Sequence, residues 1–306
     1  MSLLSRDQQI QVIGCLTEGM SIRAIERLTG IHRDTIMRLG ARVGRGCAEL
    51  HDRIMVGLRV GRIEMDELWA FVGKKQRHLK RTDNPEKGDQ YTFVALASSS
   101  RAIIAYRTGK RNGDATDQFV QDLRGRVIGS PEISTDGFLP YQPAIRDAFN
   151  ASAHGVINKT FSVTHLVHMD QAHHRYSPAQ VIAVAREAVR GEPAEISTSY
   201  VERSNLSIRM ANRRFTRLTN AFSKKLDNHL SAVALYVAHY NLCRVHESLS
   251  PNARNQTTPA MALGITDRVW SLGDLIDAAL PVASPDPTET PSERRRKFRV
   301  IEGGLS

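Results

Sequence analysis

The spacing of apolar positions changes twice along the chain, and each change marks a different kind of structure. In the first sixty residues apolar positions recur at helical spacing, separated by short breaks. From Arg62 the period becomes two, and the run R-I-E-M-D-E-L-W-A-F-V-G predicts a β-strand. From Tyr200 to about Glu247 the pattern predicts a long helical tract, which prolines end. We therefore expect helices, then a strand-rich middle, then helices again.

The helical start resembles a DNA-reading motif in its pattern. Ile22 and Leu28 lie on one face of a short helix that Gly30 breaks, and the next helix begins near His32 or Arg33. Four polar or basic side chains would face outward from that second helix: Arg33, Thr35, Arg38 and Arg42. This pattern is typical of a helix-turn-helix, whose second helix enters the major groove. A small helical hairpin packed against the rest of the chain is the alternative.

The middle of the chain predicts a mixed sheet. Two strands at 91–97 and 102–108, joined by the turn-like S-S-S-R, predict an antiparallel hairpin. A helix at 114–127 with Asp114 as N-cap, a strand at 131–137, a helix at 141–149 and a strand at 154–159 follow. This order implies a mixed sheet covered on both faces by helices.

One histidine-rich segment in this region is harder to assign. It contains His165, His168, Asp170, His173 and His174. Their spacing matches no established zinc pattern, and we favour a solvated or nucleic-acid-facing loop.

Composition indicates which class of partner the chain would bind and in which cellular compartment it would work. Lys and Arg number 42 against 32 Asp and Glu, giving a formal charge of +10, which favours a polyanionic partner. No apolar stretch has the length of a membrane span and the N-terminus has no apolar signal core, so we expect a cytoplasmic protein without a membrane partner. The three separated cysteines offer no disulfide framework. The Pro-, Ser- and Thr-rich stretch from Pro281 should be a flexible basic tail.

Three carboxylates are the candidate chemistry. Asp66 interrupts an apolar strand, where an uncompensated charge is unfavourable, and Asp136 ends another strand just before Gly137. If these strands are neighbours, the two carboxylates converge, and Glu202 at a helix start could add a third. Such oxygen ligands suit two Mg²⁺ or Mn²⁺ ions, which support phosphodiester displacement. Glu64 and Glu67 are rivals of Asp66.

Glu202 has two interpretations that stay open on the sequence. Ser199 followed by Glu202 fits a capping box, a purely structural role. Between Arg203 and Lys225, however, the chain has seven basic residues and no acidic one. A metal ligand beside a phosphate backbone would benefit from basic neighbours, here Arg209, Arg213, Arg214 and Arg217. A solvated basic helix face is the alternative, and the capping and metal roles are compatible with each other.

Several motifs together resemble a known family. M-D-E-L-W-A-F-V-G-K-K, S-T-D-G-F, S-T-S-Y-V-E-R-S-N-L and H-Y-N-L-C-R-V-H-E-S-L are similar to DDE transposases of the insertion-sequence-one type. The resemblance implies a ribonuclease-H-like core in which Asp66, Asp136 and Glu202 bind two divalent ions, with Arg203 and Asn205 positioning the helix or the DNA. The resemblance runs from about Gly61 to Trp270. Together with the helical pattern before it, we expect a helix-turn-helix domain over 1–60, a catalytic core over 61–250 and a C-terminal extension over 251–306. Members often carry an N-terminal zinc finger, which this chain lacks, so the helix-turn-helix would recognise the ends without one.

The resulting hypothesis is a transposase that binds double-stranded DNA, both its terminal repeats and its target. Metal-dependent cleavage and strand transfer would use the three acids, and Lys74 and Lys75 would contact phosphates. Two ends must be held together, so we expect a dimer or a higher oligomer on DNA. The alternatives are a non-catalytic helix-turn-helix regulator and a nuclease that cuts without joining.

Overall fold

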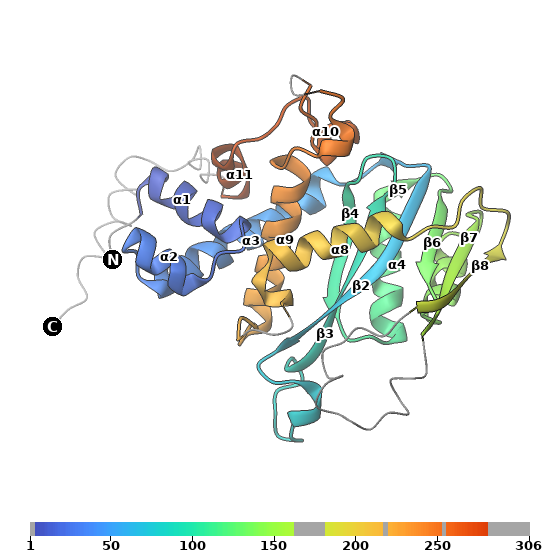
Figure 1. Cartoon of the computed structure of the whole chain (residues 1–306), viewed down its shortest axis with the longest axis horizontal. Helices are drawn as coiled ribbons and strands as arrows, with labels where there is room; N and C mark the ends of the chain where they lie inside the picture. Colours follow the sequence, from blue (N-terminus) through green and yellow to red (C-terminus); the bar gives the residue numbers. More distant parts are fainter. Residues whose placement is uncertain (1–3, 162–180, 217–219, 253–254, 281–306) are drawn as a thin grey trace, which may run out of the picture.

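A six-stranded mixed sheet forms the centre of the molecule (Figure 1). The computed structural model describes residues 4–161, 181–216, 220–252 and 255–280. The strands are β2 (Arg62–Val72), β3 (Gly88–Ala97), β4 (Ile103–Gly109), β6 (Glu132–Asp136), β7 (His154–Phe161) and β8 (Val181–Arg190), in the order β4-β3-β2-β6-β7-β8. β2, β6 and β7 run parallel, whereas β3, β4 and β8 pair antiparallel with their neighbours. The predicted mixed α/β class and the β3–β4 hairpin are confirmed, and the arrangement is compatible with a ribonuclease-H-like core.

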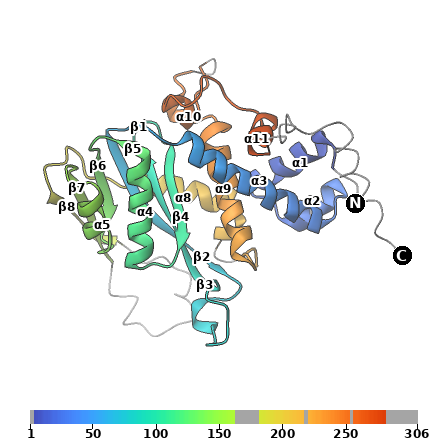
Figure 2. The ribbon, with the colours of Figure 1, turned by 180° about the vertical axis from the view of Figure 1, so that it is seen from behind.

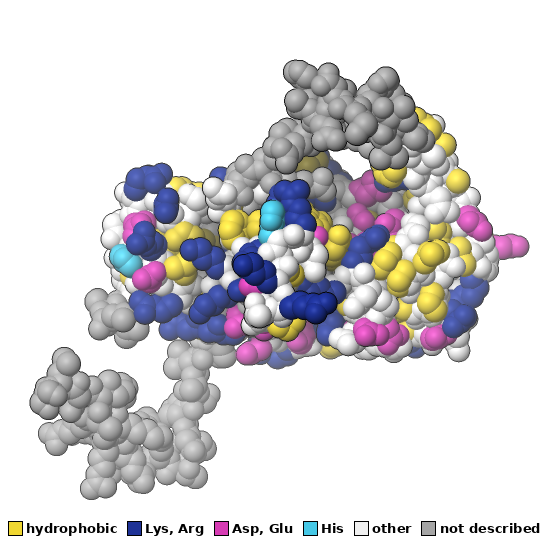
Figure 3. Space-filling view, turned by 90° about the horizontal axis from the view of Figure 1, so that it is seen from below, with side chains coloured by type: hydrophobic (Ala, Val, Ile, Leu, Met, Phe, Trp, Pro, Cys, Tyr) yellow, Lys and Arg dark blue, Asp and Glu magenta, His cyan; other side chains and the backbone are white. Residues whose placement is uncertain are grey.

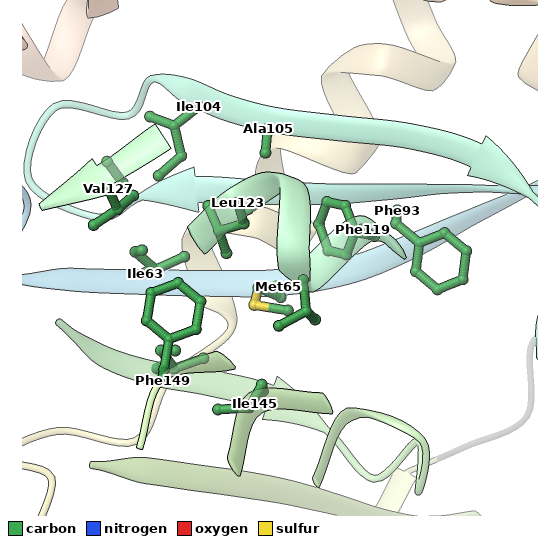
Figure 4. Close-up of a cluster of buried hydrophobic side chains, with 14 of the residues drawn as sticks. Ile63, Met65, Phe93, Ile104, Ala105, Phe119, Leu123, Val127, Ile145 and Phe149 are labelled. Atoms are coloured by element: carbon green, nitrogen blue, oxygen red, sulfur yellow. The ribbon is translucent and has the colours of Figure 1, made fainter. Parts of the chain in front are cut away.

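Helices cover both faces of the sheet, as the sequence predicts. The helices are α4 (Gly113–Arg126) and α5 (Tyr141–Ala148) on one face, and α8 (Ser199–Ala211) and α9 (Leu226–Leu242) on the other. Under α4, Phe119 and Leu123 pack on Ile63, Met65 and the aromatic ring of Phe93, all fully buried (Figure 4). Leu68 and Ala70, from the alternate positions of β2, pack on α8 and α9 instead. Strand alternation thus gives β2 two buried faces.

Shorter elements connect these layers. They are β1 (Leu58–Arg59) paired with β5 (Val127–Ile128), the 3₁₀ turns η1 (Gln76–His78), η2 (Arg213–Phe215) and η3 (Glu247–Leu249), and the helices α10 (Pro259–Ala262) and α11 (Leu272–Ala279). None of the helices among the described residues is long and apolar enough to cross a bilayer.

Three helices precede the sheet: α1 (Arg6–Thr17), α2 (Ile22–Thr29) and α3 (Arg33–Ile54). Ser21 caps the start of α2 by accepting the Ala24 N–H, and Gly30 ends it with a φ of 70°. Leu28, expected to face inward, is 67% exposed, because the α2 face that packs on α3 centres on Ile25. The role of α3 in groove recognition stays a prediction.

The second half of α3 packs against the C-terminal helices rather than against its own neighbours alone. Val43, Cys47 and Leu50 share one buried cluster with Leu235 of α9 and Ile276 of α11. We call this interface of α3 with α9 and α11 the helical seam (Figure 2). The N-terminal helices therefore complete their core with residues from the far end of the chain, and a boundary at residue 60 stays a prediction.

The structure corrects two further expectations. The helical tract after Tyr200 is broken between α8 and α9, because the Asn212 side chain accepts the Arg214 N–H and donates to the Ala232 carbonyl. The N-cap of α4 is Asn112, not Asp114. The histidine-rich segment and the basic tail lie outside the described residues.

Candidate active site

Asp66 and Asp136 lie side by side on the sheet face that α8 covers. β2 and β6 are parallel neighbours with Met65 opposite Thr135, so the next residue of each strand is a carboxylate on the same face. Carboxylate oxygens of Asp66, Asp136 and Glu67 all lie within 4.8 Å of one another. The convergence that the sequence predicts for the two aspartates is therefore present.

Asp66 is held in place by two hydrogen bonds. Asn205 Nδ2 on α8 donates to its Oδ2 at 2.7 Å, and the Glu67 N–H donates to its Oδ1 at 2.8 Å. Burial raises the pKa of Asp66 to about 6, and the nearby Asp136 charge adds to this rise. The carboxylate thus sits in a fixed orientation where its charge is not fully compensated.

Glu67, a rival of Asp66 on the sequence, is a member of the cluster from the opposite sheet face. Its side chain is only 3% exposed, and Arg111 Nε donates to its Oε2 at 3.2 Å. Burial, and next the Asp136 charge, raise the pKa of Glu67 to about 7. The Arg111 guanidinium also lies 3.7 Å from Asp136, so one cation bridges two of the acids.

Glu202 does not form the predicted capping box. The N-cap of α8 is Thr198, and the N–H groups of Tyr200 and Val201 donate at 2.8 and 3.0 Å to Glu64 Oε2, across from β2. Ser199 instead pairs with the Ser197 hydroxyl.

The Glu202 carboxylate is therefore available to the site. Its Oε1 accepts Thr198 Oγ1 and Lys159 Nζ, both at 2.5 Å, and its side chain is 41% exposed. The Glu202 charge adds to the rise in the pKa of Asp66, after burial and the Asp136 charge.

The three predicted acids open into one cleft of about 870 Å³. Its polar lining is Asp66, Arg111, Asp136, Asn158, Lys159, Glu202, Asn205 and Arg209. Gly137 allows Asn158 to approach the chain closely here, because a Cβ at this position would overlap the Asn158 side-chain oxygen. Arg111, Asn158 and Lys159 were not predicted from the sequence. The sequence could have indicated them only by their position, because each comes after the buried part of a strand that ends at the cleft.

The basic residues predicted to contact DNA are distributed over three places. Arg33, Arg38 and Arg42 are exposed and Thr35 partly exposed on α3, away from β6 and β7 (Figure 1). Near the acids, Asn205 and Arg209 line the cleft, while Arg203 is exposed beside it.

The break after α8 separates the remaining arginines from the acids. Arg213 is exposed, and Arg214 turns inward to donate to Ser223 Oγ at 2.7 Å, where burial lowers its pKa to about 10. Arg217 lies outside the described residues. In the β2–β3 connection, Lys74 pairs with Asp83 at 2.8 Å, and Lys75 lies 5.9 Å from the centre of the Phe71 ring.

Comparison with known proteins gives only distant likenesses, all among solved structures. No protein-family model matches the chain, and no curated protein matches it. Among solved structures, the chain is similar to piggyBac transposase in a synaptic complex with hairpin DNA. The identity is 11% and the TM-score 0.37, over 98% of this chain and 76% of that chain. A likeness of this size carries no functional argument, so the argument for function rests on the geometry of the cleft.

Proposed function

We propose that this chain is a DNA transposase of the DDE class, of the insertion-sequence-one type that its motifs resemble. The observation that supports this most is the meeting of Asp66, Asp136 and Glu202 in one cleft, each from a different element. The proposal includes cleavage at element ends and transfer of the freed 3′ hydroxyl to target DNA.

The donor atoms of the cleft suit a hard divalent cation. The candidate ligands are carboxylate oxygens, which Mg²⁺ and Mn²⁺ prefer. One buried oxygen beside them, Asn205 Oδ1, has no hydrogen-bond partner among the described residues. Burial raises the pKa values of Asp66 and Glu67, and the nearby Asp136 charge adds to both rises.

Asp66, Asp136 and Glu202 would hold two such ions. When bound, ions at this site would lower the pKa of an attacking hydroxyl and stabilise the leaving oxygen of a phosphodiester.

The surrounding residues have supporting roles in this proposal. Asn205 fixes the rotamer of Asp66 through its 2.7 Å hydrogen bond. Lys159 and Arg209 place positive charge at the cleft wall, where a DNA phosphate would lie. The outward face of α3 would bind the terminal repeats, and two copies would hold two ends together.

The test is strand cleavage and joining with Mg²⁺ or Mn²⁺ on DNA that carries the element ends. Glu202→Gln keeps the size of the side chain but removes its charge, so we expect loss of both activities with folding and DNA binding retained. Asn205→Ala should lower activity by roughly 10- to 100-fold, the usual effect of removing a partner of a metal ligand. Glu187→Gln, an exposed acid on β8, is the matched control and should behave like wild type.

Each alternative function has its own result. Cleavage without joined products would make the chain a nuclease. Specific DNA binding with no cleavage by the wild type would favour a regulator. Wild-type activity of Glu202→Gln would refute the triad.

A further inference from the structure

Five aromatic side chains form a row that leads to the acid cluster. Phe222 stacks on Phe71 with ring centres 4.7 Å apart, and Phe71 lies 5.8 Å from Trp69. Trp69 is the cross-strand partner of Tyr91, so both project from the same face of the sheet. Arg111 links the row onward, 5.9 Å from the Tyr91 ring centre and 3.8 Å from that of Phe138. We call Trp69, Phe71, Tyr91, Phe138 and Phe222 the aromatic platform.

Packing does not explain the outer part of this platform. Trp69 and Phe71 continue the β2 face on which Ile63 and Met65 are fully buried, yet both are partly exposed. With Phe222 they belong to none of the three buried clusters among the described residues. The cause is geometric: β2 and β3 extend past α4 as an arm, and none of the described helices covers their outer ends on this face (Figures 1 and 2). Rings on an uncovered sheet face are available to a ligand.

The side chains around the platform are positively charged, which favours a ligand with negative charge. Lys75 lies over the Phe71 ring, and the connection between β2 and β3 exposes Arg77, Lys80 and Arg81. Figure 3 views the molecule from below, with the β2–β3 connection projecting toward the viewer. Lys and Arg side chains gather on the middle of this face. Aromatic faces interleaved with cations are the usual composition of surfaces that bind single-stranded nucleic acid, because bases stack on the rings while cations contact phosphates.

The inner end of the platform meets the acids. Arg111, which stacks on Phe138, also contacts Glu67 and Asp136. Trp69 and Phe71 lie on the sheet face opposite Asp66, whereas Arg111 and Phe138 also line the cleft. A strand lying on the platform would therefore enter the cleft beyond the end of β6, where Arg111 contacts Asp136.

We propose that the aromatic platform binds unpaired nucleotides of a DNA strand and leads that strand into the acid cleft. This inference rests on the proposed function for the identity of the nucleic acid, and it adds the form in which the DNA arrives. A duplex stacks its bases on one another and hides their faces, so paired DNA would contact only the cations.

Trp69 provides a direct probe of stacking. The chain has two tryptophans, so Trp270→Phe leaves Trp69 as the single reporter. The experiment measures tryptophan fluorescence of the full chain in EDTA, during titration with an unpaired 15-nucleotide oligothymidine or with a 15-base-pair duplex. We expect the unpaired strand to quench Trp69, and the duplex to leave its emission nearly unchanged.

Ring replacement tests the same point by affinity. Phe71→Leu should weaken binding of the unpaired strand roughly five-fold or more, whereas Phe71→Tyr keeps the ring and the affinity. Leu230→Ala, an exposed apolar side chain on α9, controls for general loss of surface apolarity. Circular dichroism and thermal unfolding confirm that each variant is folded.

The outcomes separate this inference from the proposed function. Absence of quenching, equal quenching by duplex, or wild-type affinity of Phe71→Leu would overturn the platform, even if cleavage proceeds. Quenching that persists in Glu202→Gln and in a wild type without cleavage activity would support the platform while refuting the transposase chemistry.

Discussion

The helical seam and the acid cleft are built in opposite ways. In the seam, α3 approaches α9 and α11 so closely that Gly44 and Gly46 pack directly on the backbone at Ser231 and Ala279. The buried side chains of the seam are apolar, and the close approach of the backbones leaves no room for a Cβ at either glycine. At the acid cluster, burial and the nearby Asp136 charge raise the pKa values of Asp66 and Glu67. The difference teaches that apolar packing in the seam stabilises the fold, whereas the ionised carboxylates of the cleft are held at an energetic cost by the surrounding structure.

The largest expected effect is at the seam. A Cβ at Gly46 would overlap the Ala279 carbonyl group, which is backbone and cannot rotate away. We expect Gly46→Ala to lower the free energy of unfolding by about 3 kcal/mol, at the upper end of overpacking effects. Urea unfolding followed by circular dichroism measures the change.

Gly125→Ala is the matched control for this substitution. Gly125 is also helical but has open space at its Cβ position, so alanine there should stabilise the protein by about 0.5–1 kcal/mol. If both substitutions stabilised the chain, the seam would not be closely packed and the first 60 residues could fold as a separate unit.

The sequence predicts those parts of the fold that depend on local pattern. Period-two alternation places the strands, and the end of one strand beside another brings Asp66 and Asp136 together. The seam is different, because nothing in V-G-R-G-C shows that Gly44 meets Ser231, 187 residues further on, or that Gly46 meets Ala279, 233 residues further on. Close approach of helices depends on tertiary packing, so the glycines have meaning only in the fold.

The cleft shows the same limit at the level of single residues. The pattern Ser199 to Glu202 predicts a local cap, yet the cap comes from Glu64, 136 residues away from Tyr200. Glu67 alternates to the other sheet face but still reaches Asp136, because β6 ends there. Arg214 is basic and was expected at DNA, but the break after α8 turns it inward. In each case a distant partner decides between roles that the local sequence leaves open.

Glu64 gives the next prediction, because it connects β2 to the start of the helix that carries Glu202. Its buried carboxylate stabilises the α8 start that carries Glu202, accepting two N–H groups there and the Ser98 hydroxyl. Glu64→Ala would leave these donors buried without a partner, which should lower the free energy of unfolding by about 2–3 kcal/mol. Glu64→Gln keeps an acceptor oxygen and should lose less than half as much. Equal loss in both variants would mean that the charge, not the cap, stabilises α8.

The smallest expected effect is a change in the free energy of unfolding with pH, which has opposite signs at His229 and at the acids of the candidate site. His229, fully buried at the start of α9, has no hydrogen-bond partner for either ring nitrogen among the described residues. Burial, and then the Arg214 charge, lower its pKa to about 3. The unfolded chain, with a histidine pKa near 6.5, binds the proton more readily, so the free energy of unfolding falls as the pH drops below about 6.5. The raised pKa values of Asp66 and Glu67 act in the opposite direction, because their protonation at lower pH favours the folded state.

We therefore expect acid sensitivity to come from buried histidines and not from the cleft. From pH 6.5 to pH 5, His229 alone should remove about 2 kcal/mol of stability, and His229→Leu should abolish that part of the loss. Urea unfolding of both proteins at pH 5, 6 and 7 measures it, with His78→Leu, an exposed residue of the β2–β3 connection, as the control. If His229→Leu and wild type lost stability in parallel as the pH falls, the acid response would have to come from groups other than His229.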